Sequence, residues 1–213
     1  YGWDIDVNSF NWNTLIENKD TEIDRLNKIY ESLLEKAGVT ILYGSAKLQD
    51  VNTVELNQQK YKAKTILLAT GGTPFVPSIP GAELAITSNE VFHLAEKPTS
   101  AIVVGGGYIA VEFAGIFNGL GINTSLVYRG DQILRGFDND IRNHLSKEII
   151  KKGINLQLEN NVADIQLLPN GRKNVTMTDG SQQEVDCILF ATGRKPNSYN
   201  IGLEGIGLTL GSK

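Results

Sequence analysis

AIVVGGGYIA, at residues 101–110, decides the fold class of this 213-residue chain. The stretch begins with a fully apolar run, Ala101–Val104, which is typical of a central strand in a parallel sheet. Three glycines follow, and the next residues have the pattern of a helix as far as Gly119. A second apolar run, Thr124–Tyr128, predicts another strand. Strand, glycine turn, helix and strand together predict a βαβ unit.

The glycine turn has the form G-x-G-x-x-A, with Gly105, Gly107 and Ala110 at its three fixed positions. In this pattern the first glycine permits a tight turn, the second lets the backbone approach a pyrophosphate, and the alanine lets the helix pack closely on the strand. The positive end of the helix then faces the phosphates. The turn therefore predicts a dinucleotide site; the alternatives are a turn without a ligand and an S-adenosylmethionine site.

The end of the second strand indicates which dinucleotide is bound. Folds that bind NAD place an Asp or Glu there, about 20 residues after the first glycine, to bond the ribose hydroxyls. Here Arg129 stands 129 − 105 = 24 positions after Gly105, Arg135 follows, and the nearest acid, Asp131, comes two residues after Arg129. Two guanidinium groups can clamp a 2′-phosphate. The sequence therefore favours NADP(H); the other interpretation is a pair of solvated surface arginines.

The remaining elements follow from hydrophobic periodicity and from turn residues. A helix is predicted over Asn11–Lys36, with Gly38 as its stop, and a proline-rich linker over Thr73–Gly81. A further helix is predicted over Asn139–Lys152. The other predicted strands are Thr40–Tyr43, Thr53–Leu56, Thr65–Ala69, Asn155–Leu158, Val162–Leu168, Asn174–Thr178 and Val185–Phe190.

Two six-residue segments are almost identical. Ile66–Gly71 matches Ile188–Gly193 except that Leu68 replaces Phe190, and each copy follows short strands. We interpret the match as an internal duplication. The alternative is that any buried strand followed by a glycine turn would look similar.

Composition excludes several classes of protein. The net charge of −4 argues against nucleic acid as a main partner, and no apolar run approaches the ~20 residues that span a membrane. The single cysteine, Cys187, cannot form an internal disulfide, so we expect a reduced, cytoplasmic setting. Because the chain starts at Tyr1 and not at Met, we interpret it as a segment of a longer protein.

Several segments closely resemble the glutathione reductase family of flavin-dependent disulfide reductases. They are GGGYIAVEFAG (105–115), YRGD (128–131), LRGFD (134–138), YGW (1–3), FNW (10–12), and RLN (25–27) with Tyr30. The resemblance covers almost the whole chain and implies NADP(H) and FAD as cofactors. It also implies a homodimeric parent enzyme that passes electrons from NADPH to flavin, then to a redox disulfide, and finally to glutathione disulfide.

The resemblance assigns the NADP(H) contacts to the glycine turn and to the ends of strands. The expected contacts are Gly105, Gly106, Gly107, Ile109, Ala110, Glu112, Arg129, Arg135 and Gly193. Among them, Arg129 and Arg135 would hold the 2′-phosphate, and Glu112 would contact the nicotinamide amide. Tyr108 would cover the nicotinamide side of the flavin and move when NADPH enters. Taken alone, Tyr108 could be a capping aromatic.

The resemblance also places residues near flavin and substrate. The expected FAD contacts are Ala46, at the adenosine, Thr70, Gly71, and Arg194, near the flavin. Tyr30 matches a tyrosine that packs on the glutathione substrate, whereas its spacing alone would make it a core residue of an amphipathic helix.

The chain departs from the family where the chemistry of disulfide reduction is concentrated. It lacks the pair of redox cysteines, the first FAD glycine motif, the second FAD segment and the C-terminal His-Glu pair. Cys187 lies in an apolar run, where a thiol is usually inert. His93 and His144 have no partner pattern, so both are interpreted as structural, and no metal site is expected.

We therefore expect an α/β fold: a Rossmann-like NADP(H)-binding domain at 72–197, an incomplete and duplicated FAD-domain portion at 1–71, and a segment at 198–213 that returns to it. Three functions remain open. The chain could be part of a glutathione reductase, part of a trypanothione reductase or another NADPH-dependent dithiol reductase, or a stand-alone NADP-binding module. Ala46 and Arg194 favour a reductase over the module, and the compact connection at Gly119–Gly121 favours the glutathione enzyme.

Overall fold

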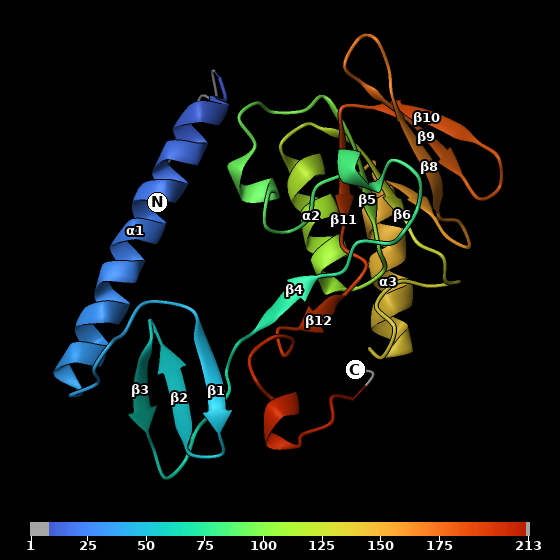
Figure 1. Cartoon of the computed structure of the whole chain (residues 1–213). Helices are drawn as coiled ribbons and strands as arrows, with labels where there is room; N and C mark the ends of the chain where they lie inside the picture. Colours follow the sequence, from blue (N-terminus) through green and yellow to red (C-terminus); the bar gives the residue numbers. More distant parts are fainter. Residues whose placement is uncertain (1–8, 212–213) are drawn as a thin grey trace. The chain divides into compact units, whose positions relative to one another are not determined.

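The computed structural model describes residues 9–211, which fold as two compact units (Figure 1). Unit 1 consists of residues 1–73 and 195–213, and unit 2 of residues 74–194. The expected α/β class with a parallel sheet is confirmed. The YGW segment at residues 1–3 lies outside the described residues. No helix within residues 9–211 is long and apolar enough to cross a membrane.

The centre of unit 2 is a parallel sheet with the strand order β11-β5-β6-β7. Its strands are β5 (Ser100–Val104), β6 (Asn123–Val127), β7 (Asn155–Gln157) and β11 (Cys187–Phe190). Every residue of β5 and β11 is buried, which explains why both are continuous apolar runs. β5 pairs with β6 on one side and with β11 on the other. The glycine turn therefore leaves the sheet from its middle.

Alternate residues of the sheet face two different cores. Ala101, Val103 and Leu189 pack on one side with helices α2 (Tyr108–Gly119) and α3 (Asn139–Lys151). Ile102 and Val104 pack on the other side with an antiparallel sheet of order β10-β9-β8. Its strands are β8 (Val162–Leu167), β9 (Lys173–Met177) and β10 (Gln182–Val185). Unit 2 is thus a three-layer structure with the parallel sheet in the middle.

The predicted single strand Val185–Phe190 is wrong, because Asp186 divides it. β10 ends at Val185 and β11 begins at Cys187, and the two strands belong to different sheets. The Asp186 carboxylate accepts a hydrogen bond from the Thr99 hydroxyl. It also accepts from the backbone N–H groups of Thr99 and Ser100, each at 2.9 Å. Arg172 Nε donates to the other carboxylate oxygen at 3.2 Å. Asp186 therefore ties the start of β5 to both sheets.

Unit 1 contains helix α1 (Trp12–Lys36) and an antiparallel sheet of β1 (Ala46–Asp50), β2 (Thr53–Leu56) and β3 (Gln59–Lys62). The predicted helix is confirmed: the Asn11 side chain caps it by accepting from Thr14 N at 2.9 Å. None of its described residues is buried. Strands β4 (Gly72–Pro74) and β12 (Arg194–Pro196) form a separate pair. Short 3₁₀ helices are η1 (Ala82–Leu84), η2 (Val91–His93) and η3 (Glu204–Ile206).

Two strands predicted in unit 1 are wrong. Thr40–Tyr43 and Thr65–Ala69 form no strand and pair with none among residues 9–211, and Leu67 is 87% exposed. A strand needs a neighbour to satisfy its backbone N–H and C=O groups. β1 and β3 were missed because both are short and mostly polar; they are held by pairing with β2. Of the two copies of the six-residue repeat, only the second forms a strand, so the duplication stays a prediction.

We predict that Asp186 makes the stability of the chain depend on pH below about 4. The hydrogen bond from the Thr99 hydroxyl, with the backbone donors beside it, lowers the pKa of Asp186 from 3.8 to about 2. A carboxyl group with a lowered folded-state pKa stabilises the fold above its unfolded pKa, and this stabilisation is lost as the pH falls through the folded pKa. Asp186→Asn should therefore reduce the free energy of unfolding at pH 7 by about 2 kcal/mol.

The measurement is urea unfolding, followed by circular dichroism, at several pH values between 7 and 2. The difference between the parent chain and Asp186→Asn should shrink between pH 4 and pH 2. Glu96→Gln serves as the control, since Glu96 is exposed and takes part in none of the described hydrogen bonds. A difference that stays constant with pH would show that the charge of Asp186 does not stabilise the fold.

Candidate functional site

The candidate site is a cavity of about 520 Å³ in unit 2, at the carboxyl ends of the central strands. Val104 of β5, Val127 of β6 and Phe190 of β11 each contribute the last residue of their strand. In open α/β sheets, ligands bind outside the carboxyl ends of the strands, at the point where the strand order reverses. Unit 2 therefore has its cavity where the order of its strands predicts one.

A steric constraint explains the first of the three fixed residues of the glycine turn, and open space surrounds the second. Gly105 has φ +143°, and a Cβ placed on it would lie 2.3 Å from the carbonyl oxygen of Ala191. Only glycine fits there, both in conformation and in space. A Cβ on Gly107, in contrast, would have no heavy atom within 4 Å, although Gly107 lines the cavity. The space above Gly107 is open to the cavity, so a ligand can approach its backbone.

Helix α2 begins at this turn and aims its N-terminus at the cavity. No side chain caps it, and no acidic residue lies in its first turn, so its first N–H groups can face an anion. Ile109 lines the cavity, and Tyr108 lines it with 57% of its surface exposed. Ala110 is fully buried beneath the turn and does not line it. Glu112 is exposed one turn further along and also does not line it.

Positive charge dominates the cavity. Arg129, Arg135 and Arg194 line it, and none of the described residues that line it is acidic. Within residues 9–211, Arg129 and Arg135 make no ion pair and no hydrogen bond, not even with the nearby Asp131. Their guanidinium groups therefore keep all their donors for a ligand.

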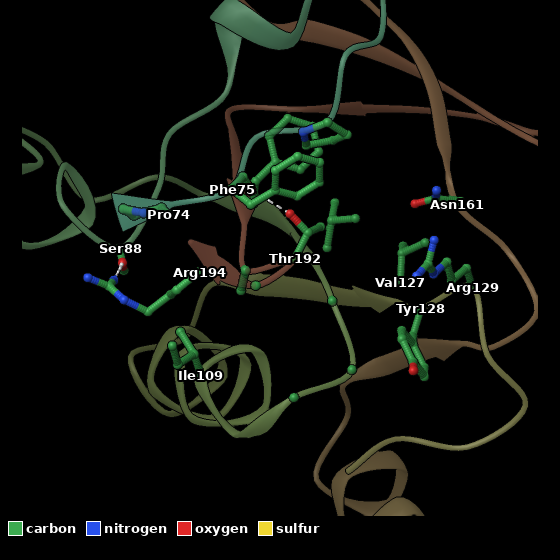
Figure 2. A pocket seen from close by; sticks show the side chains of 18 of the residues that line it. Pro74, Phe75, Ser88, Ile109, Val127, Tyr128, Arg129, Asn161, Thr192 and Arg194 are labelled. Atoms are coloured by element: carbon green, nitrogen blue, oxygen red, sulfur yellow. Dashed lines mark hydrogen bonds between the residues drawn. The ribbon is translucent and has the colours of Figure 1, made fainter. Parts of the chain in front are cut away.

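The two ends of the cavity carry different side chains, as Figure 2 shows. Arg129 and Asn161 lie at one end, and Arg194 lies at the other, where its Nη1 donates to Ser88 Oγ at 3.3 Å. Between them the Thr192 hydroxyl donates to the carbonyl oxygen of Phe75 at 2.6 Å. The Phe75 N–H returns a bond to the Gly193 carbonyl oxygen at 2.9 Å. These two bonds hold the segment after β11 against residues 74–77.

Sequence reasoning missed part of the cavity wall. Phe75, Ser88, Asn161 and Thr192 line it, and each comes from a loop without a cofactor pattern. Pro74 and Pro77 also line it, although the sequence suggested only a linker there. The one available signal was the ATGR segment at 191–194, whose Thr192 could have been expected at the site together with Gly193 and Arg194.

The remaining candidate residues lie in unit 1. Ala46 is the first residue of β1 and pairs with Leu56. The Thr70 hydroxyl donates to the carbonyl oxygen of Asn197 at 2.7 Å, and the Gly71 carbonyl accepts from Asn197 N–H at 3.0 Å. Tyr30 lies on α1 and is 62% exposed, so the interpretation as a core residue is wrong within the described chain. The FAD and substrate contacts of these residues remain predictions.

Cys187 lies outside this cavity, at the start of β11. It is 5% exposed, and burial raises the pKa of its thiol to about 11. No group of three or more His, Cys, Asp or Glu residues within 9–211 could hold a metal ion. The three arginines and the apolar side chains that line the cavity suit the binding of an anionic, partly apolar ligand.

Comparisons with known proteins show which family the chain resembles. The family model described as pyridine nucleotide-disulphide oxidoreductase matches residues 4–213. A glutathione reductase from Burkholderia cepacia is 44% identical over 210 residues, which cover 99% of this chain and 46% of that protein. A trypanothione reductase from Trypanosoma congolense is 36% identical over 228 aligned positions, which cover 100% of this chain and 46% of that protein. The chain thus spans less than half the length of these relatives.

A solved structure shows the same fold. An HOCl-induced flavoprotein disulfide reductase from Escherichia coli, in its Cu(II) complex, has a TM-score of 0.85 with this chain at 25% identity. The match covers 95% of this chain and 47% of that one. The arrangement of elements described above is therefore that of one part of such a reductase.

We predict that Cys187 does not react with thiol reagents in the folded chain. With a pKa of about 11, only about a thousandth of the thiol is thiolate at pH 8, and the thiolate is the reactive form. Ellman's reagent at pH 8 should release one equivalent of thionitrobenzoate only after denaturation in guanidinium chloride. Rapid release from the native chain would contradict the inert, buried role of this cysteine.

Proposed function

The chain belongs to the pyridine nucleotide-disulphide oxidoreductase family, and on that premise we propose that the cavity of unit 2 binds NADP(H) for a flavoprotein disulfide reductase. One observation carries the choice of cofactor: Arg129 and Arg135 line the cavity, and their side chains have no partner among residues 9–211. A dinucleotide with a 2′-phosphate supplies the dianion that two free guanidinium groups require.

The glycine turn would hold the pyrophosphate. Gly107 leaves open space above its backbone, and the uncapped N-terminus of α2 presents N–H groups and a positive dipole to the same space. The 2′-phosphate lies on the adenosine side of the molecule, so the adenosine would occupy the end that carries Arg129 and Arg135. The nicotinamide would then extend towards Arg194 and Ser88.

Two residues of α2 would orient the nicotinamide: Tyr108, which lines the cavity, and Glu112, which lies one turn further along the helix. Tyr108 and Glu112 are four residues apart, so they lie on the same face of α2. Both are exposed and free of described hydrogen bonds. In the proposed enzyme Glu112 contacts the carboxamide, Tyr108 moves aside as NADPH enters, and Gly193 borders the ring. Bound FAD would accept the hydride, with Ala46, Thr70, Gly71 and Arg194 among its contacts.

The proposed parent enzyme is a homodimeric glutathione reductase, which passes electrons from NADPH through FAD and a redox disulfide to glutathione disulfide. The identity of 44% to a glutathione reductase, against 36% to a trypanothione reductase, supports this choice. The alignment with the latter needs 228 positions for a chain of 213, which means at least 228 − 213 = 15 positions without a counterpart here. Trypanothione reductase is the second candidate, and Tyr30 is the proposed contact for the glutathione substrate.

We predict that the chain binds NADPH about a hundredfold more tightly than NADH. Each charge-assisted hydrogen bond contributes about 1.5–3 kcal/mol to binding, and solvent screening keeps the contribution of exposed arginines near the lower value. Since ~1.4 kcal/mol corresponds to a tenfold change in affinity, two such bonds account for the hundredfold preference. The double variant Arg129→Ala, Arg135→Ala should lose this preference and its salt dependence, while NADH affinity changes little. Calorimetric titration of both cofactors at two salt concentrations gives the result.

Arg25→Ala is the matched control, because Arg25 is an exposed arginine of α1 whose described partner is Glu22. It should leave both affinities unchanged. Equal affinity of the parent chain for the two cofactors would refute the proposed role of the arginines. An equal loss for both cofactors in the double variant would instead indicate damage to the fold.

We also predict that the 213-residue chain alone does not reduce glutathione disulfide. Its one cysteine is buried, and reduction of a disulfide by a dithiol needs two thiols. The assay follows NADPH oxidation at 340 nm with glutathione disulfide and added FAD. Turnover above that of the Cys187→Ser variant would contradict the assignment of the dithiol chemistry to residues outside this chain.

A further inference from the structure

The middle residue of the glycine turn is a glycine that the dinucleotide pattern does not require. Gly106 occupies a variable position of G-x-G-x-x-A, and its φ lies outside the left-handed region that favours glycine. A Cβ placed on it would lie 2.5 Å from both Cγ and Cδ1 of Tyr128. These atoms form the base of a rigid ring and cannot move away alone. Gly106 is therefore required by the Tyr128 ring.

The outer part of the same ring lies against a second glycine. A Cβ on Gly130 would lie 2.6 Å from Cε1 and 3.0 Å from Cζ of Tyr128. Gly106 belongs to the phosphate turn, whereas Gly130 belongs to the segment that carries both arginines, residues 129–135, here called the arginine loop. The Tyr128 ring thus fills the space between the turn and the start of this loop (Figure 2).

Backbone hydrogen bonds fix both ends of the arginine loop. Around Arg129, Tyr128 N–H donates to the Gln157 carbonyl at 2.9 Å, and Glu159 N–H donates to the Gly130 carbonyl at 3.0 Å. At the other end, Leu134 N–H donates to the carbonyl oxygen of Gly106 at 2.6 Å. Leu134 is buried and has φ +55°, and Arg135 follows it directly. Gly106 therefore contacts both ends of the loop, one through the Tyr128 ring and one through its own carbonyl.

We propose that Gly106 and Tyr128 form a positioning pair that sets the preference for NADPH over NADH. This inference rests on the proposed function of the cavity. The pyrophosphate and the 2′-phosphate of the cofactor are joined through one ribose, so their separation has narrow limits. The glycine turn holds the pyrophosphate and the arginines hold the 2′-phosphate, so the distance between turn and arginines must match the distance between the two phosphate groups. The Tyr128 ring keeps this distance. NADH lacks the second phosphate and does not need this match.

The test is a double-mutant cycle with Gly106→Ala, Tyr128→Ala and the double variant in the full chain. Dissociation constants for NADPH and NADH are measured by calorimetry. Each single variant should lower the NADPH/NADH affinity ratio about tenfold, which corresponds to the loss of one charge-assisted hydrogen bond. In the double variant the affinity ratio should fall by less than the product of the two single effects. The reason is that removal of the Tyr128 ring leaves space for the alanine methyl group at position 106.

Two controls separate positioning from general damage. Gly107→Ala adds a methyl group that meets no protein atom within 4 Å but faces the cavity. It should lower the affinities for NADPH and NADH equally and leave their ratio unchanged. Tyr128→Phe keeps the ring and removes a hydroxyl that makes no described hydrogen bond, so its NADPH/NADH affinity ratio should equal that of the parent chain. If Tyr128→Ala does not fold by circular dichroism, Tyr128→Leu, which keeps apolar volume without the flat ring, takes its place in the cycle.

The outcomes distinguish this inference from the proposed function. A parent chain that does not prefer NADPH overturns the proposed function itself. A parent chain that prefers NADPH, with an unchanged ratio in Gly106→Ala and in the Tyr128 variant, overturns only the positioning pair. Single effects that multiply in the double variant also overturn it, because they would show that the two residues act independently.

Discussion

The structure of unit 2 depends on a close contact between two backbone segments. The chain leaves β5 at Gly105 with φ +143°, so near to the end of β11 that a side chain would meet the carbonyl oxygen of Ala191 at 2.3 Å. This contact lets α2 begin directly above the sheet, with Ala110 fully buried beneath the turn. It also brings the ends of β5, β6 and β11 to one edge, where the cavity forms. A cavity at this place therefore requires glycine at residue 105.

The features that the sequence predicted well are those decided by neighbours along the chain. β5, α2 and β6 agree with their predicted bounds within one residue, because apolar runs and a glycine turn are local signals. α1 was equally predictable from its hydrophobic spacing and from Gly38, which follows its end. The place of Arg129 beside the glycine turn was predictable too, since a βαβ unit brings the end of its second strand back beside the turn.

The features that the sequence did not reveal depend on contacts between distant segments. Thr65–Ala69 has the same apolar pattern as β11, but β11 is a strand because β5 lies beside it, and no such neighbour exists for Thr65–Ala69 among the described residues. Asp186 interrupts an apparently continuous strand because Thr99 and Ser100, 86 or more positions away, bind its carboxylate. Phe75 and Asn161 reach the cavity from loops with no cofactor pattern. Local periodicity contains none of this information.

In the proposed enzyme, the residues that select the cofactor and the residue that contacts the substrate lie in different units of the chain. Every residue that lines the cavity lies within unit 2, so the proposed preference for NADPH needs only the turn, the arginine loop and the ring between them. Tyr30, the proposed substrate contact, lies in unit 1. A change of disulfide substrate therefore leaves the requirements at Gly105, Gly106 and Gly107 unchanged. This proposed separation is consistent with the alignment of a glutathione reductase with 99% of the chain and of a trypanothione reductase with 100% of it, although the two enzymes are named for different substrates.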